Sequence, residues 1–315
     1  MPERPVIIAT RGSALALAQA HFVFDECRRL FPRLSFEIKI IKTTGDKLQA
    51  ASLAQAGKSL PKGLFTKELE MALLREQADL AVHSLKDVPT ELPAGLGLGA
   101  VLKREDVRDI LVYKEAAGNT GLFPQLGEGA KVATSSPRRR AQLLSARPDL
   151  RIEEIRGNVA TRLEKLADND NLSGTVLAAA GLRRLKFKIG GGELRGDAVP
   201  DGLRAEILNE NVMLPCSGQA AIGIEIRSGD ERIGSLCGRL NHYNSRQAVE
   251  AERALLVAMG GGCSSPLGAL ATVDGGRMRL RAVSFLGAEM KHANAVGNVR
   301  EPEELGGEVA GMLRV

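Results

Sequence analysis

The stretch "VIIATRGSALALAQA", residues 6–20, decides the fold class of this chain. A β-branched run at Val6–Thr10 is followed by a short polar turn and then by small and apolar residues at helical spacing. The same order of strand, turn and helix returns in "KVATSSPRRRAQLL", residues 131–144. Repetition of this unit is typical of an open α/β sheet whose strands are mostly parallel.

Outward from these two stretches, strand and helix patterns alternate through most of the chain. The charged segment "KREDVRD", residues 103–109, interrupts the rhythm, which then restarts as a second lobe. From about Asn241 the pattern changes again, to one long helix and alternating strand material, which indicates a smaller third domain. The predicted strands are 35–43, 78–84, 95–102, 109–113, 150–157, 223–228, 268–273 and 277–285, and the predicted helices are 13–30, 65–77, 158–169 and 245–259.

Composition indicates a soluble globular protein. The 315 residues are 44% hydrophobic and 26% charged, and no window approaches the roughly 20 apolar residues that a membrane helix needs. The opening "MPERPVIIAT" lacks the pattern of a signal peptide, and four cysteines stand at irregular spacing. These features predict a reducing, cytoplasmic location without a disulfide framework.

The charge pattern favours small acidic molecules over nucleic acid. The formal net charge is +5, but only 3% of residues are aromatic and the longest basic run is "RRR" at Arg138–Arg140. Aromatic stacking platforms and known nucleic-acid motifs are therefore scarce. Scattered arginines suit carboxylate or phosphate groups better.

Two strand-to-helix turns are candidate anion sites. Ser13 and Ser136 are placed to cap the helices that follow them, and Pro137 occupies the favoured first helical position. Arg138 and Arg139 in that first turn oppose the helix dipole by about 0.3–1 kcal/mol each, so an anion should compensate them. That anion is either a bound ligand or a nearby carboxylate of the chain. Two such turns, facing one cleft, favour a ligand.

Further polar residues follow predicted strand ends. Arg156 and Arg162 flank Gly157-Asn158, and Arg183 and Arg184 come just past an apolar strand. His83, interpreted as a structural histidine, precedes Lys86 and Asp87 at a probable cleft mouth. Ligands of open α/β folds bind at such ends.

Together, these segments resemble a known enzyme family. "IATRGSALALAQA", "KGLFTKELE", "DLAVHSLKDVPT", "ATSSPRRRAQL", "IRGNVATRL", "LAAAGLRRL" and "GGGCSSPLG" are similar to the successive motifs of porphobilinogen deaminases, also called hydroxymethylbilane synthases. The resemblance implies a transferase of porphyrin, tetrapyrrole and heme biosynthesis. Such an enzyme condenses four porphobilinogen molecules head to tail on a covalent dipyrromethane primer, releases ammonia, and then frees hydroxymethylbilane by hydrolysis.

The resemblance also implies a domain organisation. We expect two α/β lobes like those of periplasmic binding proteins, with mixed, mostly parallel sheets around a cleft, and a smaller α+β C-terminal domain. The expected boundaries are 1–103 with 220–240 for domain 1, 104–219 for domain 2 and 241–315 for domain 3.

The same resemblance assigns the site. Asp87 matches the catalytic carboxylate, which stabilises the cation left when porphobilinogen loses ammonia. Cys263 matches the cysteine that holds dipyrromethane by a thioether. The other matching cofactor-binding positions are Lys62, Lys86, Asp87, Ser13, Thr134, Ser135, Ser136, Arg138, Arg139, Arg156, Gly157, Arg162 and Arg184. The matching substrate-binding positions are Arg11, Ser13, Phe65, Arg156, Arg162 and Gln219.

The remaining cysteines and some departures from the family pattern have separate interpretations. Cys27 lies on the apolar face of the first helix and Cys237 on a later one, so both are predicted core residues. The loop "QAGKSLPKGLF" is lengthened around Lys58–Lys62, and "GQAA" at Gly218–Ala221 replaces the usual "GQGA". No role follows for the insertion at Gly190–Gly202, and no spacing suggests a metal site.

Cys263 is better suited to be an anchor than a turnover nucleophile. It follows a helix C-terminus, whose dipole disfavours a thiolate, and no basic residue is adjacent in sequence. The expected partner is porphobilinogen, bound by a monomer, with no nucleic acid and no membrane. The competing hypothesis is a two-lobed protein that binds carboxylated ligands without catalysis.

Overall fold

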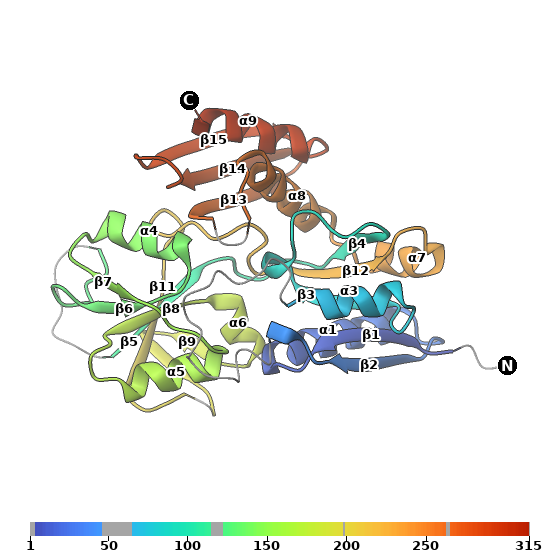
Figure 1. Ribbon diagram of the computed structural model, residues 1–315, viewed down its shortest axis with the longest axis horizontal. Helices are drawn as coiled ribbons and strands as arrows, with labels where there is room; N and C mark the ends of the chain where they lie inside the picture. Colours follow the sequence, from blue (N-terminus) through green and yellow to red (C-terminus); the bar gives the residue numbers. More distant parts are fainter. Residues whose placement is uncertain (1–3, 46–64, 115–121, 198, 263–264, 315) are drawn as a thin grey trace.

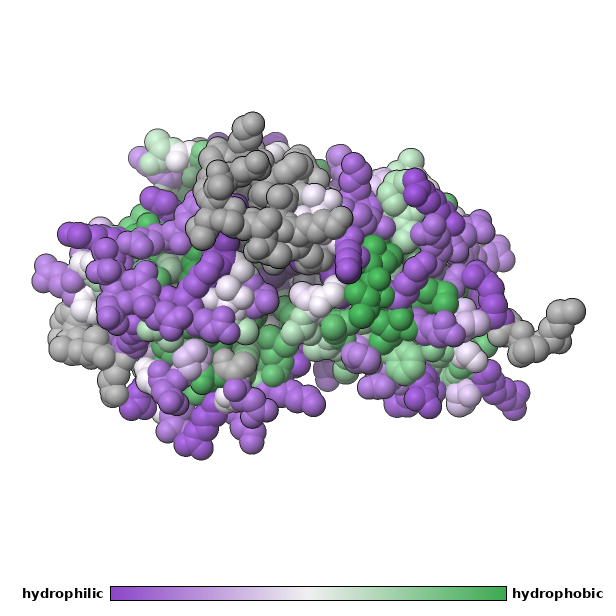
Figure 2. Space-filling model, turned by 60° about the horizontal axis from the view of Figure 1, so that its bottom comes forward, coloured by the Kyte–Doolittle hydropathy of each residue, from purple (hydrophilic) through white to green (hydrophobic). Residues whose placement is uncertain are grey.

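The computed structural model describes residues 4–45, 65–114, 122–197, 199–262 and 265–314 (Figure 1). Lys62 and Cys263, both predicted site residues, lie outside these ranges, as does the lengthened loop around Lys58–Lys62. The described residues form three sheets. In the face shown in Figure 2, hydrophilic side chains cover most of the surface, as expected for a chain with 26% charged residues.

The first sheet has the order β2-β1-β3-β12-β4. Strands β2, β1 and β3 are parallel to one another, and β12 runs antiparallel between β3 and β4. The strands are β1 (Val6–Arg11), β2 (Phe36–Ile41), β3 (Leu80–Ser84), β4 (Leu96–Val101) and β12 (Ile222–Arg227).

Helices cover both faces of the first sheet. Successive side chains of a strand point to opposite faces, so neighbouring residues pack against different helices. Ile8 packs with α1 (Ala14–Leu30) and α7 (Glu231–Leu240), whereas its neighbour Ala9 packs with α3 (Lys67–Leu74) on the other face. The predictions for two cysteines are confirmed: Cys27 and Cys237 are buried in the same cluster as Ile8. Burial raises the pKa of each thiol to about 12.

The second sheet has the order β7-β6-β8-β5-β11-β10-β9. Its β7, β6 and β8 are parallel, and the pairs from β8 to β9 are antiparallel. The strands are β5 (Asp109–Lys114), β6 (Lys131–Ala133), β7 (Arg151–Glu153), β8 (Gly174–Ala178), β9 (Lys188–Gly190), β10 (Glu193–Arg195) and β11 (Leu203–Ile207). The helices are α4 (Pro137–Ala146), α5 (Val159–Asp168) and α6 (Ala179–Arg184).

The structure changes three details of the sequence prediction in this lobe. The strand predicted over 150–157 ends at Glu153, because the Ile155 amide donates to the Ser135 hydroxyl (3.1 Å) instead of to a neighbouring strand. Arg183 and Arg184 lie in the last turn of α6, one short helix beyond the strand they were expected to follow. The described part of the Gly190–Gly202 insertion supplies β10 and its turns, and β10 lies between β11 and the edge strand β9.

The C-terminal unit is an antiparallel sheet covered by two helices. Strands β13 (Leu267–Asp274), β14 (Arg277–Ser284) and β15 (Lys291–Asn298) form the sheet. Helices α8 (Tyr243–Ala258) and α9 (Pro302–Arg314) pack on one face of it around a common apolar cluster. The predicted fold class, two mixed α/β lobes and a smaller α+β unit, is confirmed (Figure 1). The expectation of mostly parallel sheets is wrong: among the described strands of the two lobes, only β2-β1-β3 and β7-β6-β8 are parallel, and the remaining neighbours pair antiparallel because β12 and the strands from β5 to β9 reverse direction.

Two chain crossovers join the lobes, and one buried carboxylate holds both. Residues 102–108 lead from β4 to β5, and residues 208–221 lead from β11 to β12. Glu252 of α8, which has no exposed surface, accepts hydrogen bonds from Arg104 Nη1 (2.7 Å) and Nη2 (3.0 Å) and from the Gly218 amide (2.8 Å). It also accepts from the Ala271 amide of β13 (2.9 Å). The C-terminal unit is thus bonded to both crossovers.

None of the described helices combines the length and the hydropathy that a membrane span needs.

Candidate active site

Asp87 sits on a single 3₁₀ turn, η1 (Leu85–Asp87), at the end of the buried strand β3. The Leu85 amide donates to the Ala221 carbonyl (3.0 Å), and the Val88 amide donates to the Leu85 carbonyl (3.1 Å). Leu85 and Val88 are buried, whereas Asp87 is exposed and Lys86 half-buried. Buried apolar residues on both sides therefore hold the turn and leave its carboxylate accessible.

Arg162 of α5 comes from the other lobe to the neighbourhood of Asp87. Asn158 caps α5 by accepting from the Thr161 amide (3.0 Å), and Arg162 Nε donates to the Gly157 carbonyl (2.8 Å). Burial lowers the pKa of Arg162 to about 10, Arg139 pushes it the same way, and Asp87 opposes them. The predicted residue Arg162 is therefore within electrostatic reach of both Arg139 and Asp87.

Arg184 is a second half-buried cation of the same kind. Its Nη2 donates to the Ala220 carbonyl (2.6 Å) on the second crossover. Burial lowers its pKa to about 10, and Glu105 opposes the shift. Neither Arg162 nor Arg184 makes an ion pair within the part of the chain that the structure describes. Partly desolvated guanidinium groups without a paired carboxylate are suited to bind an anionic ligand.

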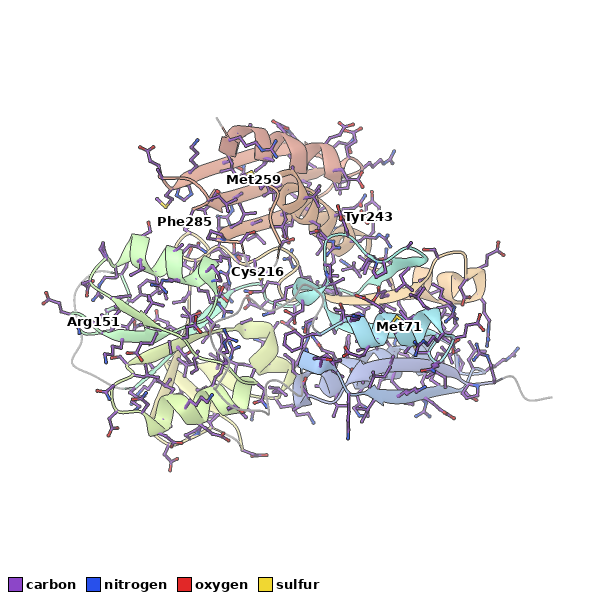
Figure 3. The ribbon with its side chains drawn as sticks, viewed as in Figure 1. Met71, Arg151, Cys216, Tyr243, Met259 and Phe285 are labelled. Atoms are coloured by element: carbon purple, nitrogen blue, oxygen red, sulfur yellow. The ribbon has the colours of Figure 1, made fainter. Side chains whose placement is uncertain are left out.

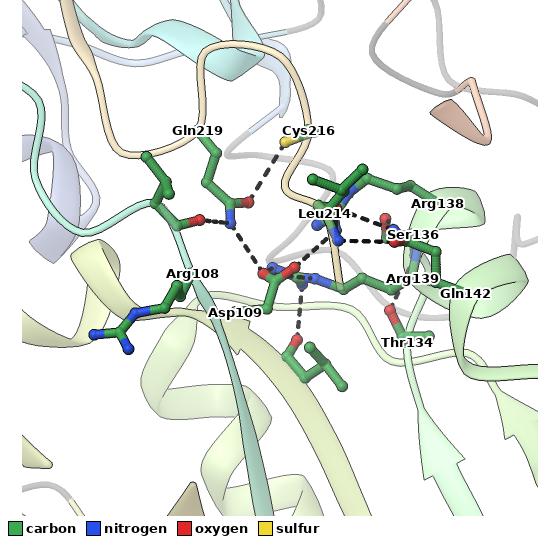
Figure 4. Close-up of polar contacts among 12 residues, drawn as sticks. Arg108, Asp109, Thr134, Ser136, Arg138, Arg139, Gln142, Leu214, Cys216 and Gln219 are labelled. Atoms are coloured by element: carbon green, nitrogen blue, oxygen red, sulfur yellow. Dashed lines mark hydrogen bonds and ion pairs between the residues drawn. The ribbon is translucent and has the colours of Figure 1, made fainter. Parts of the chain in front are cut away.

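Arg138 and Arg139 are compensated by the chain itself (Figure 4). Arg138 Nη1 lies 2.7 Å from Asp109 Oδ2, and Arg139 Nη2 lies 2.7 Å from Asp109 Oδ1. Both arginines are more than nine-tenths buried, and Asp109 has no exposed surface. Each arginine also donates to a backbone carbonyl: Arg138 to that of Leu214 (2.6 Å) and Arg139 to that of Val176 (2.7 Å). Of the two interpretations that the sequence left open, pairing with a carboxylate of the chain is the one observed here.

The strand-to-helix turns fold as their sequences predict. Ser136 caps α4 by accepting from the Arg139 amide (3.4 Å), and Ser13 caps α1 by accepting from the Ala16 amide (3.3 Å). Thr134 Oγ1 accepts from the Ser136 amide (3.2 Å). Ser135 Oγ donates to the Ile155 carbonyl (2.8 Å), which joins the α4 turn to the segment that leads to α5.

Arg156 and Gly157 lie at the start of α5. The Arg156 side chain is about half exposed, at 48%, and its Nη2 lies 3.5 Å from Glu154. Gly157 has φ +126°, and a Cβ there would lie 2.8 Å from Thr161 Cγ2, so this position requires glycine. The turn therefore brings the Gly157 carbonyl to Arg162 and leaves Arg156 facing solvent.

Arg11 and Phe65 are in contact within the first lobe. The Arg11 guanidinium carbon lies 4.2 Å from the centre of the Phe65 ring, which is a cation–π geometry. Both are predicted substrate-binding positions. The ring orients the planar guanidinium just beyond the end of β1, beside the cap at Ser13.

Gln219 is placed differently from the sequence prediction. Its side chain has no exposed surface, and its Nε2 donates to the Val107 carbonyl (2.6 Å) and to Asp109 Oδ1 (3.1 Å). Its Oε1 accepts from Cys216 Sγ (3.5 Å). Gln219 thus bonds the two crossovers together, and this geometry gives no support to a contact with substrate. Cys216 lies where the three units meet (Figure 3).

The glycine loop after α8 has a defined entry. Gly260, with φ +65°, ends the helix in the left-handed conformation, and the Gly261 amide donates to the Leu256 carbonyl (2.9 Å). Beyond the undescribed residues, Ser265 closes the loop: its amide donates to the Gly262 carbonyl (2.9 Å) and its Oγ accepts from the Gly262 amide (2.9 Å).

Sequence reasoning missed several buried charges around the site. His83, interpreted as structural, is buried with Nε2 3.0 Å from Glu225 Oε2 of the neighbouring strand β12. Glu70 lies near this pair, and burial raises its pKa. Asp109 and Glu252 were also missed, and the only signal for them was the excess of buried arginines that they compensate. No group of ligating side chains that could hold a metal occurs among the residues described here.

Surface hollows do not mark the site. One is lined by Phe31, Leu34 and Arg232 at the outer end of the first lobe. Another lies between the second lobe and the C-terminal unit and is lined by Gln142, Arg281 and others. Neither contains Asp87 or Arg162, so the placement of charges, not hollow size, identifies the candidate site.

Comparison with known proteins supplies the family. Residues 6–235 match the family model described as porphobilinogen deaminase, dipyromethane cofactor binding domain, and residues 246–314 match porphobilinogen deaminase, C-terminal domain. A porphobilinogen deaminase of Moorella thermoacetica is 46% identical over 97% of this chain and 92% of its own length. One from Thermus thermophilus is 44% identical over 98% of this chain and 94% of its own length.

Among solved structures, the VFT2 domain of Bordetella pertussis BvgS aligns with a TM-score of 0.44 at 15% identity, over 75% of this chain and 86% of that one. Nothing further rests on so distant a likeness.

The two lobes, the exposed carboxylate of Asp87 within electrostatic reach of Arg162 and the matched cofactor-binding domain define an enzyme of tetrapyrrole synthesis. The chain belongs to the porphobilinogen deaminase family. The family resemblance of the sequence is confirmed.

Proposed function

We propose that this protein condenses four porphobilinogen molecules head to tail, with release of ammonia, and then releases hydroxymethylbilane by hydrolysis. Family membership supports the reaction. The structural observation that supports it is an exposed carboxylate, Asp87, within electrostatic reach of Arg162, a partly buried cation that lacks an ion pair among the described residues. The first group suits a developing cation, and the second suits the carboxylates of substituted pyrroles.

Asp87 acts in this proposal on the reacting carbon of porphobilinogen. The bond from that carbon to the amino nitrogen breaks, ammonia leaves with the electron pair, and the remaining pyrrole carries a delocalised positive charge. A carboxylate about 4 Å away, at an effective dielectric constant of about 20, stabilises such a charge by roughly 4 kcal/mol. If the contact forms mainly in the transition state, it accelerates the step about a thousandfold.

A bound dipyrromethane would supply the free pyrrole carbon that forms the new carbon–carbon bond and then loses its proton. We propose that Cys263 anchors this group through a thioether. The residues that fit its carboxylates best are Arg162 and Arg184, because they are partly buried and have no ion pair in the described chain. Around them we place the remaining cofactor positions, namely Lys62, Lys86, Ser13, Thr134, Ser135, Ser136, Arg138, Arg139, Arg156 and Gly157.

Arg138 and Arg139 have a second task in this proposal. Asp109 pairs with both but carries only one negative charge, so the two arginines shape the α4 turn and still add positive potential near Arg162. The side chains that suit incoming porphobilinogen are Arg11, held by Phe65, and the exposed Arg156.

We keep the predicted division into domains 1–103 with 220–240, 104–219 and 241–315 as part of this proposal. We also infer a monomer and a cytoplasmic location; the free thiols Cys27, Cys216 and Cys237 support only the location.

Intact-protein mass and turnover test this function together. The purified protein should be heavier than its sequence by two linked pyrrole units, and Cys263→Ala should have the bare sequence mass. Incubation with porphobilinogen should release ammonia and form hydroxymethylbilane. A protein of bare mass that binds porphobilinogen without releasing ammonia would instead support the carboxylate-binding alternative.

A further inference from the structure

Side chains of helix α8 contact the segment that contains Asp87 and the residues just after it. Arg253 Nη2 donates to the carbonyls of Pro89 (2.6 Å) and Thr90 (3.1 Å), and its Nη1 donates to that of Val88 (3.1 Å). These three consecutive carbonyls begin one residue after Asp87. A planar guanidinium with several fixed donors can hold three acceptors at once, which a single ammonium does less well.

A second contact comes from the same face of the helix. Val249, one turn before Arg253, has no exposed surface and packs in one cluster with Leu85 and Val88. These two residues are the buried flanks of the Asp87 turn. Apolar packing from Val249 and hydrogen bonds from Arg253 thus hold one six-residue segment, Leu85–Thr90, and both reach Val88.

The second crossover closes around the turn from the other side. A Cβ on Gly218 would lie 3.3 Å from the Leu85 carbonyl carbon and 3.3 Å from the Lys86 nitrogen, so the crossover touches the backbone of the turn. The Gly218 amide is in turn bonded to Glu252, the residue before Arg253. One helix therefore fixes the turn directly and also through the crossover.

The same helix leads to the proposed cofactor anchor. From Arg253 the helix continues to Ala258, a rise of about 7.5 Å at about 1.5 Å per residue, and the glycine loop that contains Cys263 in sequence follows. Helix α8 therefore contacts the turn of Asp87 and also precedes, in sequence, the loop that contains Cys263. In the chain, 176 positions separate Asp87 from Cys263 (263 − 87).

We propose that Arg253 is a positioning residue, which sets the place of the Asp87 carboxylate relative to the loop that carries the cofactor. The inference rests on the proposed function and adds a residue to it. Arg253 does not touch reacting atoms in this proposal; it acts through Asp87. A displacement of about 1 Å at a reacting group can cost about a hundredfold in rate, so loss of these three hydrogen bonds should affect turnover more than binding.

The test compares Arg253→Met with Arg246→Met in the complete, cofactor-loaded protein. Arg246 is the matched control, because it lies on the same helix seven residues earlier and also donates to a first-lobe carbonyl, that of Gly99 (3.4 Å). We expect Arg253→Met to keep the cofactor mass and a KM within about twofold, while kcat falls by about ten- to a hundredfold. Arg246→Met should keep kcat within about twofold, and Arg253→Lys should recover part of the loss.

Two further measurements separate positioning from general structural damage. In an Asp87→Glu background, Arg253→Met should cost much less than it does in the wild type, because both changes act on one carboxylate. Hydrogen exchange of the amides in residues 85–90 should speed up about tenfold in Arg253→Met and remain unchanged in Arg246→Met. Equal kcat for the two methionine variants, fully multiplicative losses, or unchanged exchange at residues 85–90 would overturn the proposal. The exchange result does not depend on turnover, so it stands even if the wild-type protein proves inactive, which would refute the proposed function instead.

Discussion

The carboxylate of Asp87 lies close enough to the guanidinium of Arg162 to oppose the lowering of the Arg162 pKa by burial, although the two residues belong to different lobes. Asp87 follows β3 of the first sheet, and Arg162 belongs to the first turns of α5 beside the second sheet. Any relative movement of the lobes changes the distance between these two groups. The electrostatics of the candidate site are therefore coupled to the arrangement of the lobes.

Asp87→Asn should keep the cofactor and lose almost all turnover. The amide has nearly the same shape but no charge, so it would no longer stabilise the cation that forms when ammonia leaves. We expect kcat to fall about a thousandfold, measured as ammonia released per enzyme, with the holoprotein mass unchanged. Near-normal turnover of this variant would remove Asp87 from its assigned role.

Arg162→Met should lower turnover while keeping or raising the Tm of the cofactor-free protein. The charged side chain is partly buried without an ion pair in the described chain, and burial lowers its pKa, so the unliganded fold should gain by its removal. We expect the Tm of cofactor-free protein to stay equal or rise, while turnover with the cofactor bound falls at least tenfold. Exposed Arg151 on β7 provides a control, because Arg151→Met should alter neither quantity appreciably. A large drop in the Tm of Arg162→Met would show that this arginine is structural.

Asp109→Asn should destabilise the protein strongly. The change leaves Arg138 and Arg139 as buried, uncompensated cations, and breaking such a pair typically costs about 3–5 kcal/mol. Urea unfolding at pH 7 measures the loss. Asp170→Asn, which removes a fully exposed partner of Lys114, should cost no more than about 1 kcal/mol. Equal losses for the two variants would contradict this interpretation.

The same carboxylate predicts how stability depends on pH. Burial alone would raise the pKa of Asp109, but the charges of Arg138 and Arg139 outweigh it and hold this pKa well below its ordinary value. Its contribution is therefore complete above the unfolded-state pKa of about 3.9 and is lost as pH falls below that value. Asp109→Asn should show a flatter decline in unfolding free energy below about pH 4 than the wild type.

Ala220→Gly should stabilise the protein slightly. Ala220 has φ +70°, a left-handed conformation that costs a non-glycine residue about 1–2 kcal/mol, whereas glycine's greater freedom in the unfolded chain offsets about 0.5–1 kcal/mol of the gain. We expect a net increase of roughly 0.5–1 kcal/mol in unfolding free energy. The buried neighbour Ala221, which is not among the positive-φ residues, is the control, and Ala221→Gly should be destabilising. Stabilisation by both changes would point to a cause other than backbone strain.

The order of elements could be predicted from the sequence because it depends on local periodicity. The alternation along β1 and the helical spacing of α1 are visible in residues 6–20, and the caps at Ser13 and Ser136 form as predicted. Failures occurred where tertiary contacts decide. The "AAAG" run before Arg183 suits a strand or a helix equally, and only its packing makes it α6.

The partners of the charged side chains could not be predicted for the same reason. Nothing near Arg138 in the sequence identifies Asp109 as its counter-ion, because the two are brought together by pairing of the strands between them. Gln219 matched a family position yet is buried, and Arg253, which donates to the Pro89 carbonyl, received no role from the sequence. Conversely, Asp87 and Arg162 were predicted by motif, and the structure adds that the charge of Asp87 reaches Arg162 across the two lobes.

The position of β12 has a consequence for how the protein is made. This strand, Ile222–Arg227, lies between β3 and β4, so the middle of the first sheet is missing until the ribosome has passed residue 227. The ribosome adds about 5–20 residues per second, so β12 is synthesised on the order of ten seconds after β4. During that time the edges of β3 and β4 that pair with β12 have no partner strand. The strands of the second sheet are complete by Ile207, within one continuous stretch of chain. The later part of the polypeptide can therefore fold first, and the nascent N-terminal region is the part that needs protection from aggregation.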